Sequence, residues 1–392
     1  METTLSLNMR RQKVIREFFP KLGDCEMMYK KFHKYPELPC QERDTASRVA
    51  HFLRAIRYDV QIEIGGHSVV GIFKNGHGRN VLLRSELDAL PIKEKTGLPY
   101  ASKVEQVDAD GIKKAVMHAD AHDMDITCLL GAAVLLKKAH RKWSGTLIVL
   151  FQPNGERLLG AKAMVKDKLF GKIPLPDVCL AQHCVPTKSG TIAVKPGRVL
   201  GCLDSLDIRV YGRSAHGATP HLGINPITIS AVIIAHLQTI ATREMDPKEP
   251  VVIGCGKFHA GTDPSVIPEY ADFTVDVRTY TKRTQTLATA AVKGAILDKC
   301  KALGCPVDPR IRTSSSTPSV DNDIKATSQF TESLEGYYGR RAPEVIQTMQ
   351  PEIIANDFAL LSLPPHGKPI PYVYWNIGTV GISPPSTTKP VT

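Results

Sequence analysis

The sequence predicts an α/β fold in which a mixed, mostly parallel sheet is sandwiched by helices, with a smaller α+β domain inserted into it. Short apolar runs alternate with helical patterns through the first half of the chain, as is typical of strands buried on both faces. From about residue 204 apolar and polar residues alternate instead, which is typical of strands with one solvated face. With 392 residues, 42% of them apolar, the chain is also longer than one ordinary domain.

The elements of the larger domain can be assigned in order. Residues 14–53 show the apolar spacing of helices, interrupted at His33-Lys34-Tyr35-Pro36-Glu37. Strands are expected at residues 69–73, 80–84, 145–151 and 177–181. The last three are continuously apolar and helical patterns lie between them, so we expect them to be buried on both faces.

The inserted domain is predicted to follow a β-α-β-β-α order. Its expected elements are a strand at residues 205–210, a helix at 225–243, strands at 251–257 and 271–279, and a helix at 284–303. The segment 313–321 is rich in Ser, Thr and Pro, and predicts the linker that returns to the larger domain. We therefore place the domain boundaries at 1–203, 204–313 and 314–392.

Charge and composition narrow the class of protein. The net charge is +11, but the basic residues are dispersed, so we expect no nucleic-acid partner and only a mild attraction of anionic small molecules. No apolar run reaches 18 residues and the N-terminus lacks a signal-like apolar stretch, so we expect no membrane association. Nine cysteines without a repeated close spacing favour reduced thiols, and thus a cytoplasmic protein.

Residues 117–125 concentrate two histidines and three aspartates. Imidazole and carboxylate are ligands that suit zinc, manganese or cobalt, and Asp120 and His122 can point the same way from a loop. A solvated polar turn is the alternative. The apolar run that follows, residues 126–136, favours a ligand loop leading into a buried helix.

Two further candidate ligands follow predicted strands. Glu156 comes shortly after the strand at 145–151, and His183 follows the one at 177–181. Either one alone would more often be a local hydrogen-bonding residue. Because parallel strands bind ligands at their carboxyl ends, we expect these two to meet Asp120 and His122 at a metal site.

Ordered motifs along nearly the whole chain resemble the metallo-amidohydrolases that include aminoacylase-like carboxypeptidases, hippurate hydrolase and plant auxin-conjugate hydrolases, the twentieth family of metallopeptidases. The motifs are His33 to Glu37, Leu83-Arg84-Ser85-Glu86-Leu87-Asp88-Ala89-Leu90-Pro91-Ile92, Met117 to Asp123, Leu130-Gly131-Ala132-Ala133, Phe151-Gln152-Pro153, Gly212 to Ala218, and Val266-Ile267-Pro268-Glu269 with Val277-Arg278. The resemblance implies a divalent-metal α/β domain, a lid domain that makes a homodimer, and hydrolysis of N-acyl amino acids or small peptides.

The chain departs from the family at the predicted metal ligands. Asp120 stands where the family has a ligand cysteine, and Asp125 where it has a later histidine. A carboxylate in place of a thiolate shifts the preference toward harder cations such as manganese, magnesium or calcium. The segment 381–385 offers no histidine where the family supplies its last ligand. The metal expected from the ligand types is zinc, manganese or cobalt. Because the last ligand is missing, we expect the occupancy of the site to be reduced or absent.

A second departure concerns the general base. The family carries two adjacent glutamates after Phe-Gln-Pro, the first a base and the second a metal ligand, whereas this chain has Gly155 and Glu156. Glycine has no side chain to accept a proton. Loss of a positioned base typically lowers the rate by a factor of about 10²–10⁴.

Three positions in the inserted domain carry over as substrate contacts. By resemblance, His216 reaches a neighbouring active site and stabilises oxyanion charge, and Arg278 pairs with a substrate carboxylate. Ser265 replaces the family's asparagine, so contacts there are expected to differ. The alternatives are a surface or capping histidine and a structural salt bridge.

Our leading hypothesis is a divergent enzyme of this family that acts on an acyl-amino-acid or peptide-like small molecule, in a biosynthetic step such as amide formation or cyclisation rather than in efficient hydrolysis. A second hypothesis is a true amidohydrolase in which Asp120, Asp123 or Asp125 has become the base. A third is a catalytically dead binding homologue. If the site works without metal, we expect Asp120, His122 and Asp125, together with His216, to be the catalytic groups.

Overall fold

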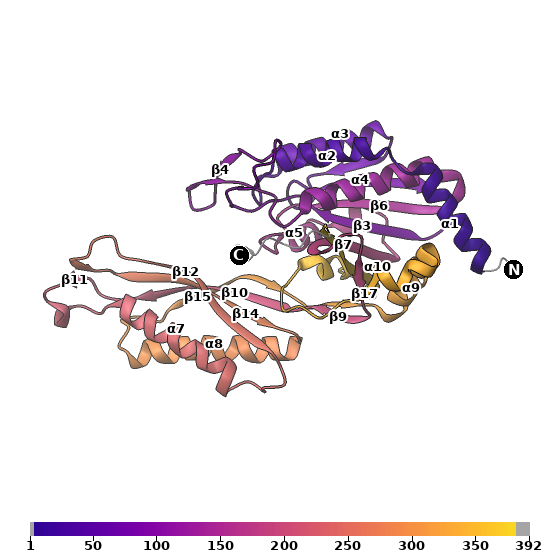
Figure 1. Cartoon of the computed structure of the whole chain (residues 1–392). Coiled ribbons are helices and arrows are strands. Elements are labelled where there is room, and N and C mark those ends of the chain that lie inside the picture. The colour runs from indigo at the N-terminus through magenta and orange to yellow at the C-terminus, as the bar shows by residue number, and fades with distance from the viewer. Residues whose placement is uncertain (1–3, 382–392) are drawn as a thin grey trace. The chain divides into compact units, whose positions relative to one another are not determined.

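The computed structural model describes residues 4–381 and divides into two compact units. Unit 1 comprises the described parts of Met1–Val199, Asn322–Gln350 and Leu360–Thr392. Unit 2 comprises Leu200–Asp321 and Pro351–Ala359. Unit 2 contains the strands and the two long helices drawn in pink and orange in Figure 1.

Unit 1 is built on a sheet that joins eight strands within residues 4–381, in the order β1-β2-β6-β3-β7-β18-β8-β17. The strands are β1 (Asp59–Ile62), β2 (Val69–Asn75), β3 (Asn80–Glu86), β6 (Gly145–Gln152), β7 (Val178–Lys188), β8 (Ile192–Val194), β17 (Ile346–Thr348) and β18 (Tyr372–Val380). The central pairs β6-β3, β3-β7 and β7-β18 are parallel, whereas the β1-β2, β2-β6 and β18-β8 pairs are antiparallel. The predicted mixed, mostly parallel sheet is confirmed.

Helices cover both faces of this sheet. Figure 1 shows α2, α3 and α4 on one face and α9 and α10 on the other. The bounds are α1 (Thr4–Phe18), α2 (Leu22–Lys34), α3 (Arg43–Ala55), α4 (His122–Lys138), α5 (Gly160–Lys166), α6 (Leu169–Lys172), α9 (Ile324–Tyr338) and α10 (Ala342–Val345), with 3-10 turns η1 (His140–Lys142), η3 (Gly339–Arg341) and η4 (Asp357–Ser362). The predicted break after α2 occurs at Tyr35-Pro36, because proline disfavours the helical conformation of the residue before it.

The core of unit 1 explains why the apolar runs become strands and a buried helix. Val149, Leu150 and Phe151 of β6 are fully buried, as a strand covered on both faces requires. Ile126 and Leu130 of α4 lie in the same unit and are also fully buried. The short antiparallel pair β4 (Glu105–Val107) and β5 (Lys113–Ala115) precedes the loop into α4. The short strands β9 (Gly197–Leu200) and β16 (Val320–Asn322) lie where the chain passes from one unit to the other.

Unit 2 is an antiparallel sheet of four strands, in the order β12-β14-β10-β15, packed on two helices. The elements are β10 (Cys202–Tyr211), β11 (Ala215–His216), η2 (Pro220–Leu222), α7 (Pro226–Arg243), β12 (Val251–Ala260), β13 (Val266–Ile267), β14 (Tyr270–Thr279), α8 (Lys282–Ala302) and β15 (Arg310–Thr317). Leu206, Ile208 and Val210 alternate along β10 and enter the core shared with α7 and α8. The change of sequence pattern near residue 204 reflects this one-sided burial.

The prediction of a return linker at residues 313–321 is wrong. Residues up to Thr317 belong to β15, which pairs antiparallel with β10, and Val320–Asn322 forms β16. The long elements of unit 2 therefore follow a β-α-β-β-α-β order. Backbone hydrogen bonds to β10 stabilise a strand here whatever the polarity of its side chains, and threonine is itself favourable in strands.

Candidate metal centre

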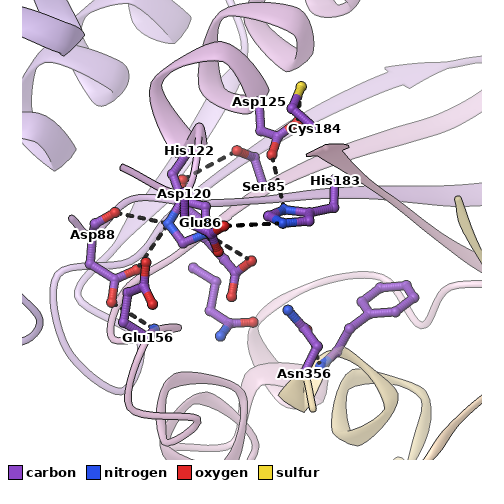
Figure 2. Close-up of polar contacts among 12 residues, drawn as sticks. Ser85, Glu86, Asp88, Asp120, His122, Asp125, Glu156, His183, Cys184 and Asn356 are labelled. Carbon is purple, nitrogen blue, oxygen red and sulfur yellow. Dashed lines mark hydrogen bonds and ion pairs between the residues drawn. The ribbon is translucent and has the colours of Figure 1, made fainter. Parts of the chain in front are cut away.

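The loop before α4 and the strand β7 bring together Asp120, His122 and His183 (Figure 2). One ligand atom of each lies within 4.8 Å of the others. Asp120 Oδ1 is 3.4 Å from His183 Nε2, and Asp120 Oδ2 is 3.7 Å from His122 Nε2. Atoms bonded at about 2 Å to one ion stand roughly 3–4 Å apart, so these three can hold a divalent ion after small side-chain movements.

Local backbone geometry places two of these side chains. Ala121 adopts the left-handed conformation, with φ 59° and ψ 20°, between Asp120 and the first residue of α4, His122. This turn separates the exposed Asp120 from His122, which is only 3% exposed. His183 comes from β7, which lies between β3 and β18 in the sheet.

Both histidines direct Nδ1 toward an oxygen and Nε2 toward Asp120. His122 Nδ1 lies 2.8 Å from the main-chain oxygen of Asp88, an acceptor, so Nδ1 carries the proton and donates it. His183 Nδ1 faces Asp125 Oδ2 at 3.6 Å. Histidines that bind metals are oriented in this way by carbonyl or carboxylate partners. Asp125, expected to be catalytic, thus lies where it can orient His183.

Glu156, the fourth expected ligand, lies outside the set of three. Its main-chain N–H donates to Asp88 Oδ2 at 2.9 Å, and Figure 2 shows its carboxylate beside that of Asp88. Glu156 Oε1 is buried and has no hydrogen-bond partner in the part of the chain that the structure describes. Burial raises the pKa of Glu156 to about 8, although the charge of His122 acts in the opposite direction. A buried carboxylate without a partner is what a cation would satisfy.

The electrostatics of the cluster favour positive charge. Burial works against a charged His122, but the neighbouring carboxylates of Glu86 and Asp88 raise its pKa well above the usual value. Partial burial likewise works against a charged His183, yet Asp120 and Asp125 raise its pKa to about 10. Protons on imidazole are the charges that a bound divalent ion displaces. The residues present therefore fit a divalent metal.

Sequence reasoning missed Glu86 and Asp88 as parts of this site. Glu86 ends β3, with Oε2 2.7 Å from Arg84 Nη1 and 3.4 Å from His122 Nε2. Asp88 is fully buried two residues later. Both come at or just after the end of a buried strand, as Glu156 and His183 do. The same rule, that ligands lie at the carboxyl ends of parallel strands, therefore identifies Glu86 and Asp88 after the predicted strand at 80–84.

The other two carboxylates proposed as bases are engaged elsewhere. Asp123 Oδ2 lies 2.6 Å from His33 Nδ1, whose Nε2 is 3.0 Å from Glu94 Oε1. Asp125 Oδ1 accepts hydrogen bonds from Gln182 Nε2 at 3.0 Å and from Cys184 Sγ at 3.2 Å.

The expected substrate contacts lie in unit 2. His216 is exposed on β11, and its Nδ1 accepts a hydrogen bond from the main-chain N–H of Ala218 at 3.1 Å. Ser265 is also exposed. It lies close to His216, because its main-chain oxygen accepts a hydrogen bond from the N–H of Gly217 at 2.6 Å. Arg278 forms a half-buried ion pair with Asp276 at 3.0 Å.

His216 and Arg278 lie at opposite ends of the unit 2 sheet. Tyr270, at one end of β14, pairs with Tyr211, four residues before β11 begins. Arg278 is eight residues further along β14, a distance of roughly 27 Å in a strand. The structure thus brings Ser265 and His216 together, but not Arg278.

A family model described as peptidase family M20/M25/M40 matches residues 82–386. The chain belongs to this family. It is 34% identical to the hippurate hydrolase of Campylobacter jejuni over 349 residues, which cover 88% of this chain and 86% of the relative. It is also 32% identical to the N-acetyldiaminopimelate deacetylase of a Geobacillus species over 314 residues, or 79% of each chain.

Solved structures share the fold. The Bacillus subtilis YXEP protein, a dinuclear metal binding peptidase from the M20 family, matches with a TM-score of 0.67 and 24% identity over 91% of this chain and 88% of its own. An aminobenzoyl-glutamate utilization protein from Klebsiella pneumoniae matches with a TM-score of 0.71 and 18% identity over 94% of this chain and 93% of its own.

Family membership confirms the prediction of an amidohydrolase-family enzyme that acts on C–N bonds. The prediction of a divalent metal is likewise confirmed by the candidate site at Asp120, His122 and His183. The segment 381–385, where the resemblance places a last histidine ligand, extends beyond the described residues.

Proposed function

We propose that this protein is a divalent-metal enzyme that acts on the C–N bond of an N-acyl amino acid or peptide-like small molecule, and that it is a poor hydrolase. The observation that carries the metal is the convergence of Asp120, His122 and His183, whose ligand atoms lie within 4.8 Å of one another. Despite burial, the neighbouring carboxylates raise the pKa of both histidines, as expected where negative charge favours a cation. A divalent ion held there supplies Lewis acidity toward an amide carbonyl. Asp120, His122 and His183 would hold it, with Glu156 as the fourth ligand.

The poor hydrolysis is inferred from Gly155. No side chain at this position can accept a proton from water, and Asp123 is bound to His33 instead. We propose that the enzyme works in the direction of amide formation or cyclisation, as a biosynthetic step in which water must not compete. One relative is named a hippurate hydrolase and the other an N-acetyldiaminopimelate deacetylase, so efficient hydrolysis is the second candidate function.

The proposed substrate contacts come from unit 2. His216 Nδ1 accepts a hydrogen bond, so in the neutral ring Nε2 carries the proton and can donate to developing oxyanion charge. Arg278 can pair with a substrate carboxylate, because its guanidinium presents two parallel donors. Ser265, beside His216, is a third candidate substrate contact, with a shorter side chain than His216 or Arg278.

We further propose a homodimer formed by unit 2. β12 is an edge strand of its sheet, and Val252 and Phe258 on this strand are exposed at 45% and 38%. Pairing of such edges covers unpaired backbone groups. It would also let His216 serve a neighbouring site. A stable monomer in sedimentation at micromolar concentration would contradict this assembly.

The proposed location is the cytoplasm. No disulfide joins cysteines within residues 4–381, which fits a reducing compartment. Within residues 4–381, no helix combines the length and the apolar composition needed to cross a membrane.

The decisive experiment combines metal content with turnover. Protein purified without chelator should contain divalent metal by elemental analysis, and manganese should restore it after removal. Hippurate-like and acetyl amino acids should then be hydrolysed well below the ordinary range of about 1–10³ per second. The reverse reaction, followed by mass spectrometry with acyl donor and amino acid, should be the faster one. Ordinary hydrolytic rates would refute the biosynthetic direction, and absence of metal binding would refute the metal proposal.

A further inference from the structure

Gly155 lies against the side chain of Glu86. Gly155 is buried in the turn that follows β6, and β3 ends at Glu86 opposite Gln152, the last residue of β6. A Cβ atom added at position 155 would stand 2.7 Å from Cδ and 2.9 Å from Cγ of Glu86, and closer still to Oε1. Non-bonded carbon atoms are normally about 3.5–4.0 Å apart. The Glu86 carboxyl group therefore occupies the space that a side chain at position 155 would need.

The carboxylate of Glu86 is held firmly at this place. Glu86 is only 4% exposed, and Oε2 pairs with Arg84 Nη1 at 2.7 Å. The Arg84 guanidinium is itself fixed, since Nε and Nη2 each donate to Gln152 Oε1 at 3.0 Å. The same Glu86 oxygen lies 3.4 Å from His122 Nε2, the ring nitrogen that faces the candidate metal position. Figure 2 shows Glu86 among the ligand side chains.

We propose that Glu86 is the acid–base carboxylate of the amide reaction, supplied from the end of β3 in place of a side chain at position 155. This inference rests on the proposed function and names the group that moves its proton. Slow hydrolysis is still expected, because Glu86 is only 4% exposed and is held by Arg84, so it reaches water less readily than a side chain presented at position 155. Asp123 lies against His33 and Asp125 against His183, while Asp120 and Glu156 are proposed ligands. Glu86 is ion-paired too, through Oε2, but its Oε1 is directed to position 155. Among the carboxylates that face this edge of the sheet, Glu86 is thus the one placed both beside His122 and over Gly155.

The proton transfer balances in both directions. In hydrolysis, the water oxygen bonds to the amide carbon and a water proton passes to Glu86. The C–N bond then breaks, and Glu86 returns that proton to the leaving nitrogen, so the products are a carboxylic acid and an amine. In amide formation the same carboxylate takes a proton from the attacking amine and delivers it to the oxygen that leaves as water.

The first test measures the shared space without any reaction. Gly155→Ala should lower the thermal midpoint of the metal-free protein by about 2–6 °C, because its Cβ displaces the Glu86 carboxyl group. In the background of Glu86→Ala or Glu86→Asp, the same change should cost less than half as much. Equal losses in the three backgrounds would overturn the inference, because independent positions add.

The second test measures the chemical role. Turnover is measured on whichever hippurate-like or acetyl amino acid the wild-type protein turns over fastest. On that substrate Glu86→Gln should lower kcat by about 10²–10⁴, while the manganese Kd measured by calorimetry changes less than about threefold. The exposed Glu105→Gln is the matched control and should leave both unchanged. The double variant Glu86→Ala with Gly155→Glu should regain turnover relative to Glu86→Ala alone.

The outcomes separate the two proposals. Loss of manganese binding in Glu86→Gln would make Glu86 a ligand and overturn the acid–base role. Unchanged kcat, or a wild-type protein without turnover in either direction, would overturn it as well. A wild-type protein that turns over substrate but binds no metal would instead refute the proposed metal function. The acid–base role of Glu86 would then be decided by the kcat of Glu86→Gln alone.

Discussion

The ligand edge of unit 1 and the β11–β13 loop of unit 2 both present histidines, but in opposite surroundings. His122 is 3% exposed and its two ring nitrogens face Asp88 and the carboxylates of Asp120 and Glu86. His216 is exposed and bonds only locally, to the main chain of Ala218, among the contacts described. Buried carboxylates around an imidazole create a site for a cation, whereas an exposed imidazole with one nitrogen engaged is suited to donate a hydrogen bond.

A second contrast lies within the metal-binding loop itself. His118 is buried like His122, but neither of its ring nitrogens has a hydrogen-bond partner within residues 4–381, and burial lowers its pKa to about 4. His118 is therefore neutral, while the carboxylates beside His122 favour its charged form. Burial alone therefore does not make a histidine a metal ligand, because His118 is buried too. The negative charge of the carboxylates beside His122 is what favours a cation there.

The largest expected effect sharpens the first contrast. His122→Ala should weaken manganese binding by more than about 100-fold, because it removes one of three converging ligands. His216→Ala should leave manganese affinity unchanged while lowering turnover. Calorimetric titration of both variants checks this. Equal affinities would show that the cluster of Asp120, His122 and His183 is not the metal site.

A smaller effect is expected at Asp125. Asp125→Asn removes the charge that faces His183 Nδ1 at 3.6 Å, and loss of such an orienting partner typically costs about 10–100-fold in metal affinity. Asp59→Asn, an exposed aspartate on β1, is the control. An unchanged Kd in Asp125→Asn would mean that His183 is oriented by packing alone.

His33 predicts a pH dependence of stability in unit 1. Hydrogen bonding to Asp123 raises the pKa of His33 to about 9, despite burial, and Glu94 adds to the effect. Its contribution to stability is therefore complete below the unfolded pKa of about 6.5 and is lost as the pH rises through 9. The loss should be about 3 kcal/mol.

Urea unfolding of the metal-free protein at several pH values between 6 and 10 measures this loss, and His33→Gln should flatten the curve. The rings of Tyr29 and Tyr100 also pack on His33 and stay in place in the variant. A slope that persists in His33→Gln would assign the pH dependence to another group.

The smallest expected effect is at Arg278. Its ion pair with Asp276 is about a third exposed, so Arg278→Ala should change the free energy of unfolding by less than about 1 kcal/mol. If Arg278 pairs with a substrate carboxylate, KM for acyl amino acids should nevertheless rise. An amidated substrate without that carboxylate is the control, and an equal rise in its KM would assign Arg278 a structural role.

The sequence alone was sufficient for the fold and for three of the candidate ligands. Apolar runs identified β3, β6 and β7 because strands covered on both faces are mostly apolar, with polar residues gathered toward their carboxyl ends. The helical run after Asp120 and His122 likewise indicated that their loop enters a buried helix. The motifs shared with the amidohydrolases then identified the family.

Tertiary structure alone decided the strand β15 and the surroundings of the ligands. The Ser- and Thr-rich segment became a strand because β10 offers it backbone hydrogen bonds, which no local pattern records. The sequence shows that Gly155 lacks a side chain, but only the packing of β3 against β6 places the Glu86 carboxylate in that space. Residues 69 positions apart share one volume only after the sheet has formed, because strand pairing, not sequence distance, determines which side chains meet.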